Sequence, residues 1–458
     1  MSLADQTSDI GVGTLPKQEL PTRPSVHTSN DKEEEFSKQR QKILDALKDK
    51  IKLNLGDGPS SSFCTDPKTY VTLTVLPENH DKLIRRQYKI AETLLPYVTA
   101  GLMDWLKRGK IMEAPAGCKF NNPLVIAPKF DKDGKIKGIR ICIDSRQLNK
   151  YLVEDDRFEI PEIPDILNRM NGCKIFGEFD LTEAYYQFKL TPESRQYTAF
   201  SWGNKQYQMV GVPYGIKFIP SFFQRYMNSL FSDMPFVFPY LDNITFGSKT
   251  WEEHLQHASM IIDRLNSVNL KLNPKDGINI GNSEIRILGH LITEQGIGID
   301  PEKKKIILAW NKPTDGLKLA SFLGLGCYLR GHVRHYADIT ARLEAEKART
   351  KSKNRIKWTP ELELDFELTK KAIANAPFLS FVDWKKPLHI AVDASLRAIG
   401  GLLYQPLTDK GEITDSNILA ICSKKLSITS LYHFSHSKLY KSLLFCFINL
   451  LSINNVWS

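Results

Sequence analysis

The chain has 458 residues, of which 42% are hydrophobic and 25% are charged. This length leaves room for about three domains with buried cores, and the composition excludes a chain that is disordered throughout. Lys and Arg outnumber Asp and Glu by 62 to 52, which gives a formal net charge of +10. A basic surplus favours a polyanionic partner, although a basic solvated surface would give the same count.

The seven cysteines are scattered, with no Cys-x-x-Cys pair. This pattern argues against a disulfide framework or a zinc site and indicates a reducing compartment. Residues 1–35 are polar and carry no apolar core, so we expect no signal peptide and no secretion. The longest apolar stretch, residues 443–451, is shorter than the ~20 residues of a membrane span, so we expect no membrane partner.

The first third of the chain shows two helical patterns and a hairpin. Residues 1–35 are expected to be disordered, and apolar residues from Phe36 to Ile51 predict a short amphipathic helix. A second helical pattern, between residues 85 and 111, ends at Gly109 as a C-terminal glycine would end it. Two strand-like runs then flank a lysine-rich loop, at residues 123–128 and 139–143.

The lysine-rich hairpin loop has two interpretations. It is either a solvated turn, the usual role of such a loop, or a flap that closes on a phosphate. In the second case Lys129 and Arg140 would be the phosphate ligands, since Arg binds through two parallel hydrogen bonds and Lys acts as a point charge.

The middle of the chain alternates strand and helix patterns, which describes an α+β body with antiparallel pairing. We expect a short helix at residues 161–170, a strand at 174–180 and an antiparallel strand pair at 197–202 and 206–210. A helix at 220–231, a hairpin at 236–247 and a second helix at 250–268 are expected to follow.

The hairpin at residues 236–247 carries Asp242-Asn243 at its expected tip. A carboxylate held between apolar strands is costly unless a metal ion or a cation pairs with it. Asp180 ends the expected strand at residues 174–180, and two acids at the ends of adjacent strands can hold a pair of divalent ions. Taken alone, Asp242-Asn243 fits a simple polar turn equally well.

Residues 284–345 are expected to be helical after a short run at 285–289, with a turn at Gly296. Residues 347–357 carry six basic residues, which indicates a solvated linker or a contact to a phosphate backbone. Two strand patterns at residues 388–395 and 399–404 predict a separate small α/β unit.

Several motifs occur in a fixed order between residues 85 and 425: Arg140-Ile-Cys-Ile-Asp144-Ser-Arg146-Gln-Leu-Asn149-Lys150, Phe179-Asp180-Leu-Thr-Glu-Ala-Tyr-Tyr-Gln187, Val212-Pro-Tyr-Gly-Ile-Lys217, Tyr240-Leu-Asp242-Asn243, Ile287-Leu-Gly-His290 and Val392-Asp393-Ala-Ser395. Each is weak alone, but the set is specific. It resembles the reverse transcriptase of gypsy-class long-terminal-repeat retrotransposons, followed by the start of their RNase H domain.

The resemblance implies a right-hand polymerase with fingers, palm and thumb, followed by an incomplete RNase H-like α/β domain. The corresponding divisions are residues 1–80, a mostly disordered N-terminal extension with a short helix; residues 81–250, the fingers and palm; residues 251–345, the palm end, thumb and connection; and residues 346–458, the incomplete RNase H-like unit. It also implies an RNA-directed DNA polymerase that uses an RNA template, a DNA or RNA primer and deoxynucleoside triphosphates. Such a protein would work in the cytoplasm, including virus-like particles, or in the nucleus; its oligomeric state is left open.

The family's metal site maps onto four positions. Asp180 and Asp242 match the palm aspartates that hold two magnesium ions, with manganese as an alternative, and the Leu181 backbone would add a ligand. Asn243 stands where the family has a further aspartate. It keeps an oxygen ligand but loses a charge, so ion binding should weaken or change its metal preference.

The family's nucleotide and primer sites map onto further residues. The resemblance implies that Lys129 and Arg140 grip the triphosphate and that Tyr185 packs under the sugar. It also implies that Tyr214 and Gly215 border the nucleotide and template. The loop at Leu288-Gly289 would position the primer end. Ordinary core packing at Tyr185 and a plain strand-to-turn junction at Leu288-Gly289 are the alternatives.

Two departures bear on activity. Phe218-Ile219 replaces the family's Asn-Ala and is expected to crowd the nucleotide site. Asp393 matches the first RNase H acid, but no acid falls near residues 438–440, where the family's glutamate is expected, so we expect no RNA cleavage. No protease or integrase signature is found, and two functions stay open: an active reverse transcriptase, or a decayed copy that at most binds nucleic acid.

Overall fold

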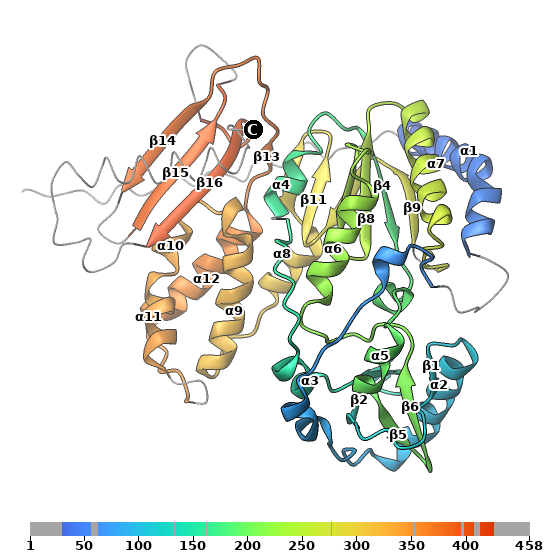
Figure 1. Cartoon of the computed structure of the whole chain (residues 1–458). Coiled ribbons are helices and arrows are strands. Elements are labelled where there is room, and N and C mark those ends of the chain that lie inside the picture. The colour runs from blue at the N-terminus through green and yellow to red at the C-terminus, as the bar shows by residue number, and fades with distance from the viewer. Residues whose placement is uncertain are drawn as a thin grey trace, which may run out of the picture.

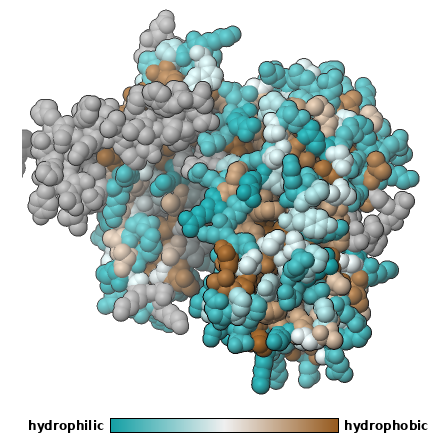
Figure 2. Space-filling model, in the orientation of Figure 1, coloured by the Kyte–Doolittle hydropathy of each residue, from teal (hydrophilic) through white to brown (hydrophobic). Residues whose placement is uncertain are grey.

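The protein combines a large body of sheets and helices with a smaller C-terminal sheet (Figure 1). The computed structural model describes residues 30–55, 63–131, 133–161, 163–275, 277–350, 354–394, 398–406 and 413–425. In this part of the chain, no helix has both the length and the apolar character needed to cross a membrane. Figure 2 shows a largely hydrophilic surface, with a hollow between the C-terminal helices and the larger body.

A four-stranded sheet lies at the centre of the larger body, in the order β7-β8-β4-β9. All three neighbouring pairs are antiparallel. The strands are β4 (Ile175–Asp180), β7 (Val237–Tyr240), β8 (Asn243–Ser248) and β9 (Ile278–Asn282). The expected strand at residues 174–180 and the expected hairpin at 236–247 are thus confirmed as elements.

One face of this sheet forms the main hydrophobic core. It packs against α6 (Ile219–Leu230), α7 (Trp251–Ser267) and α1 (Asn30–Leu55). Phe179 and Phe246 stack here with ring centroids 5.2 Å apart. A Cβ on Gly177 would lie 2.2 Å from Cζ of Phe246, so only glycine fits this close approach.

The N-terminal helix is longer than expected. The sequence predicted a short helix from Phe36, whereas α1 spans 26 residues and begins at Asn30. Its buried residues Ile43 and Leu47 belong to the core shared with α7, and most helical stability comes from such packing. The disorder expected for residues 30–35 and 63–80 is wrong, because the former lie in α1 and the latter pack into the main core through Val71, Leu73 and Val75. Residues 1–29, also expected to be disordered, lie outside the described residues.

A small sheet, a long hairpin and several short helices lie in the first half of the chain. The sheet order is β1-β6-β5, and β2 pairs with β3. The elements are α2 (Leu95–Lys107), β1 (Ile111–Glu113), β2 (Leu124–Phe130), β3 (Ile136–Ile143), α3 (Arg146–Tyr151), α4 (Ile163–Asn168), α5 (Pro192–Arg195), β5 (Phe200–Trp202) and β6 (Lys205–Met209). Gly109 adopts φ 66° just after α2, which confirms the predicted helix end.

Residues 290–299 correct the sequence analysis, because they form two strands where a helical segment was expected after residue 289, and Gly296, expected at a turn, is the first residue of the second strand. The sheet order is β10-β11-β12-β13, with β10 (Glu284–Ile287), β11 (His290–Thr293), β12 (Gly296–Ile299) and β13 (Leu379–Ser380). A Cβ at Gly296 would lie 2.1 Å from the carbonyl oxygen of Leu379. The glycine therefore permits a close strand contact with a segment far along the chain.

The C-terminal half continues with helices and a last sheet. The helices are α8 (Pro301–Leu308), α9 (Gly316–Leu329), α10 (Tyr336–Ile339), α11 (Ala341–Arg349) and α12 (Pro360–Ala374). The antiparallel sheet contains β14 (His389–Ala394), β15 (Ala398–Tyr404) and β16 (Ile418–Lys425). The predicted small unit with two strands is therefore confirmed, whereas the expected linker at 347–357 begins inside α11.

Candidate active site

The hairpin between β7 and β8 carries Asp242, but its tip differs from the prediction. The connection is Leu241-Asp242, and Asn243 is the first residue of β8, paired with Tyr240. Leu241 adopts φ 52°, a left-handed conformation that is uncommon outside glycine. Its N–H donates to the side-chain oxygen of Gln224 at 2.7 Å, so contacts from α6 decide where the turn lies.

Asp180 and Asp242 lie together at one end of the central sheet. Asp180 ends β4 and pairs in register with Asn243, and the next N–H, from Leu181, donates to the Asp242 carbonyl at 3.1 Å. Both acidic residues are half-buried. Asn273 donates from Nδ2 to Oδ2 of Asp180 at 3.2 Å, which fixes one carboxylate oxygen.

Tyr185 and Tyr214 lie beside this pair of acids. Their ring centroids are 5.0 Å apart. Burial, followed by the negative charge of Asp242, raises the pKa of each tyrosine to about 12. Tyr185 is half-buried, while Tyr214 is 36% exposed, so the two phenol rings border an accessible surface next to the carboxylates.

Gly215 and the hairpin formed by β2 and β3 approach the same region. Gly215 has φ 100°, and its carbonyl accepts from Nδ2 of Asn149 at 2.7 Å. The positive charge of Arg140 acts on Tyr214, where it opposes the rise in pKa. Lys129 is exposed and lies on the same face of the hairpin as Arg140, because Ala127 pairs with Arg140. Arg140 is therefore near the tyrosines, whereas Lys129 lies farther along the hairpin.

The remaining predicted residues lie in other elements. Leu288 and Gly289 form the turn between β10 and β11, with φ values of 49° and 78°. The Tyr328 hydroxyl donates to the Leu288 carbonyl, which ties this turn to α9. Asp393 is exposed on β14, in the separate C-terminal sheet (Figure 1). Residues 438–440 lie outside the described residues.

Phe218 and Ile219 were expected to crowd the nucleotide site. They are 5% and 1% exposed and belong to the main hydrophobic core. Their bulk is accommodated in that core.

Two residues near the acids were missed by sequence reasoning. Gln224 is fully buried on α6 and binds the hairpin backbone on both sides of Tyr240. Glu178 is half-buried on β4 and accepts a hydrogen bond from Nδ2 of Asn243. Burial raises the pKa of Glu178. The available signal for Glu178 was strand alternation, which puts residues 178 and 180 on one face.

Comparisons with known proteins show the family of the chain. Residues 127–292 match the family "Reverse transcriptase (RNA-dependent DNA polymerase)", and residues 358–450 match "RNase H-like domain found in reverse transcriptase". The Pol polyprotein of transposon 297 from Drosophila melanogaster is 32% identical over 337 residues, covering 72% of this chain and 31% of that relative. This chain belongs to the reverse transcriptases of retrotransposon Pol polyproteins.

Other relatives of this reverse transcriptase are similar in extent. The Pol polyprotein of Drosophila melanogaster transposon gypsy is 27% identical, covering 74% of this chain and 33% of the relative. The Tf2-7 polyprotein of Schizosaccharomyces pombe is 28% identical, covering 73% and 24%. The chain thus spans about a third or less of the length of these relatives.

Solved structures match the fold over most of the chain. The foamy viral protease-reverse transcriptase in complex with dsDNA has a TM-score of 0.77 and 25% identity, covering 92% of this chain and 83% of that one. The same viral protein with an RNA/DNA hybrid gives a TM-score of 0.76 at 23% identity, covering 92% and 54%. The right-hand polymerase fold followed by an RNase H-like domain is therefore confirmed.

Proposed function

We propose that this reverse transcriptase lengthens a primer on an RNA template by two-metal nucleotidyl transfer. Asp180 and Asp242 would hold two divalent ions, magnesium first and manganese as the alternative. The observation that supports this best is the hydrogen bond from Leu181 to Asp242, which joins the ends of two strands that carry the acids.

The residues present suit a hard cation. Two half-buried carboxylates and the backbone of Leu181 offer oxygen ligands, which magnesium prefers. Among the described residues, no cluster of three or more Asp, Glu, His or Cys side chains could hold one ion. This agrees with a magnesium site completed by water and substrate phosphates. When bound, such ions activate the primer 3′-hydroxyl and neutralise charge on the leaving pyrophosphate.

The side chains around the acids would orient the nucleotide. Tyr185 would pack under the deoxyribose, where a 2′-hydroxyl would collide with its ring, and Tyr214 with Gly215 would border the base. Arg140 would bind the triphosphate, and Lys129 would reach it if the exposed hairpin closes. The turn at Leu288-Gly289, held by Tyr328, would position the primer end.

Nucleic acid and deoxynucleoside triphosphates are the proposed partners. The foamy viral proteins with the same fold were solved with dsDNA and with an RNA/DNA hybrid, and the net charge of +10 suits a polyanion. Binding of a primer-template should weaken steeply with salt, because each phosphate contact releases counterions. An affinity that is unaffected by salt would contradict binding through phosphate contacts.

A second candidate is a protein with this fold that binds nucleic acid without extending it. The observation that favours it is Asn243, an amide where the family has a carboxylate. We also propose that the RNase H-like unit does not cleave RNA. Asp393 matches the first acid of that site, but the sequence has no acid near residues 438–440, where the family's glutamate is expected.

Primer extension on an RNA template separates the two candidates. The natural chain, Asp180→Asn, Asp242→Asn and the control Asp263→Asn would be compared in magnesium and in manganese. Asp263 is an exposed acid that pairs with Lys50 on the outer helices. Extension by the natural chain and the control alone supports the polymerase. Extension that survives Asp180→Asn refutes the metal assignment, and template binding with no extension by any variant supports the second candidate.

A further inference from the structure

Glu178 lies at the centre of a polar row that crosses three strands of the central sheet. Asn243 on β8 stands directly opposite Asp180, and Asn279 on β9 stands opposite Glu178. Facing residues in antiparallel strands project to the same side of the sheet. Glu178, Asp180 and Asn243 therefore share one face, the face opposite the main core.

The hydrogen bonds in this row leave little freedom to Asn243. Its Nδ2 donates to Glu178, and its Oδ1 accepts from the Thr245 hydroxyl at 2.9 Å. Asn279 also hydrogen-bonds to Glu178 through its side chain. A half-buried carboxylate between two asparagine side chains receives the donors that it needs.

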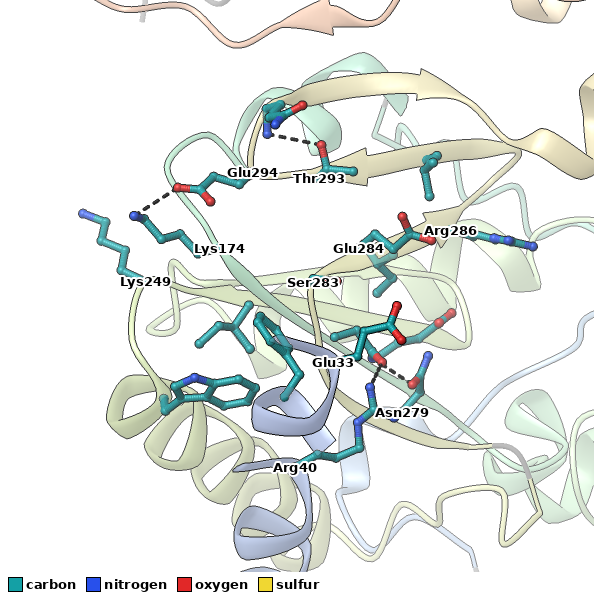
Figure 3. A pocket seen from close by; sticks show the side chains of 18 of the residues that line it. Glu33, Arg40, Lys174, Lys249, Asn279, Ser283, Glu284, Arg286, Thr293 and Glu294 are labelled. Atoms are coloured by element: carbon teal, nitrogen blue, oxygen red, sulfur yellow. Dashed lines mark hydrogen bonds and ion pairs between the residues drawn. The ribbon is translucent and has the colours of Figure 1, made fainter. Parts of the chain in front are cut away.

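The groove beside β9 shows that the row is open to solvent on one side. Glu178 and Asn279 line this cavity of about 1370 Å³ together with residues of α1, β10 and β11. Figure 3 shows Asn279 and Arg40 at its edge, with Glu284 across from them. Glu284 is exposed in the same cavity, so it offers a matched carboxylate away from the row.

We propose that Glu178 is a positioning residue for the polymerase site: it fixes the amide of Asn243 beside Asp180 and supplies the negative charge that Asn243 lacks. The charge that Glu178 supplies to the site rests on the proposed function, whereas the hydrogen bond between Asn243 and Glu178 does not. An aspartate at position 243 would set a carboxylate against the carboxylate of Glu178, with Asp180 beside both, and like charges at that range repel. Asparagine at 243 is therefore the residue that Glu178 requires.

A double-mutant cycle of Asn243→Asp and Glu178→Gln tests the pairing. Thermal unfolding is measured without metal or nucleic acid, so the result does not depend on polymerase function. Asn243→Asp alone should lower the apparent Tm by several degrees. The double variant moves the carboxylate to position 243 and the amide to 178, so the hydrogen bond re-forms with its direction reversed, and most of the lost Tm should return.

Manganese binding to the protein alone tests the link to the site. Titration by calorimetry should give on the order of tenfold weaker binding for Glu178→Gln, because a nearby charge is lost. The double variant should bind close to the natural affinity, and Glu284→Gln should leave it unchanged.

Two results would overturn the proposal. One is an Asn243→Asp variant that is as stable as the natural chain, with effects that add to those of Glu178→Gln. The other is manganese affinity that is the same in Glu178→Gln and Glu284→Gln. A failure of the proposed function differs from both, since it would leave the unfolding cycle intact while Asp180→Asn kept full primer extension.

Discussion

Replacing Gln224 by leucine tests whether one buried amide holds the hairpin that carries Asp242. Gln224 is 0% exposed. Its Nε2 donates to the Pro239 carbonyl at 2.8 Å and to Oδ1 of Asn228 at 2.8 Å, and its Oε1 accepts from Leu241 N–H at 2.7 Å. The Gln224 side chain thus supplies hydrogen-bond partners to the backbone on both sides of Tyr240, in the way that a neighbouring strand would.

The expected cost follows from the groups that leucine leaves unpaired. Leucine has about the same volume as glutamine, so the cavity contribution is small. The Leu241 N–H and the Pro239 C=O lose their partners, and each unsatisfied buried group costs about 1–3 kcal/mol. We therefore expect a loss of roughly 2–6 kcal/mol in the free energy of unfolding. Leu241 sits at φ 52°, so the tip should relax and displace Asp242.

Urea unfolding and primer extension should be measured together on the Gln224→Leu variant. We expect a lower unfolding midpoint and extension reduced by more than about tenfold, since a displacement near 1 Å at a reacting group can cost 10²-fold. Asn228→Ala is the matched control, because it removes a partner of Gln224 that does not belong to the hairpin. Natural stability in Gln224→Leu, or an equal loss in Asn228→Ala, would refute the reasoning.

Three further outcomes are expected. Tyr185→Val should reduce discrimination against ribonucleotides by roughly tenfold or more, because the tyrosine ring that would meet the 2′-hydroxyl is removed. The ratio of kcat/KM for a deoxyribonucleotide to that for the matching ribonucleotide measures this discrimination. An unchanged ratio would contradict the sugar contact. Arg140→Ala should raise the KM for deoxynucleoside triphosphates with little change in kcat, as steady-state kinetics would show. Burial lowers the pKa of His290 to about 4 and that of His332 to about 3, so the unfolded chain binds more protons below pH 6.5 and stability should fall as the pH drops from 6.5 toward 4. Unfolding midpoints across that range should change less in His332→Phe, and an identical pH dependence would show that the histidines do not contribute.

Local patterns predicted the central elements well, because each depends on the spacing of neighbouring residues. Helix α7 begins after Thr250, whose hydroxyl accepts the Glu253 N–H at 3.2 Å, and such a cap is visible in the sequence. The pair β5 and β6 turns at Gly203, with φ 57°. These signals need no knowledge of distant contacts.

The turn between β7 and β8 could not be predicted in the same way. Turn statistics favour Asp and Asn, which suggested Asp242-Asn243 as the tip. The amide of Gln224, on another element, binds Leu241 and moves the turn by one residue. A shift of one residue reverses the face to which every later side chain points, so the orientation of Asn243 depends on a tertiary contact.

The strands at residues 290–299 and the role of Glu178 were missed for a related reason. The short apolar runs of β11 and β12 carry no clear period, and Gly296 becomes meaningful only through its contact with Leu379. Glu178 has its hydrogen-bond partners on two other strands. Strand alternation puts Glu178 on the same face as Asp180, but its own segment does not show that these partners lie opposite it.

The surroundings of Asn243 bear on whether the amide marks a lost activity. If asparagine had simply replaced an aspartate at position 243, the neighbouring groups would still suit a carboxylate. Hydrogen-bond donors would then surround both side-chain oxygen positions. Here the nitrogen of Asn243 meets a carboxylate, Glu178, and only its oxygen meets a donor, Thr245. A carboxylate at 243 could not satisfy both contacts unless one acid held a proton. The site is therefore built for asparagine, and the Asp180 and Asp242 variants, rather than the identity of residue 243, decide whether the chain extends a primer.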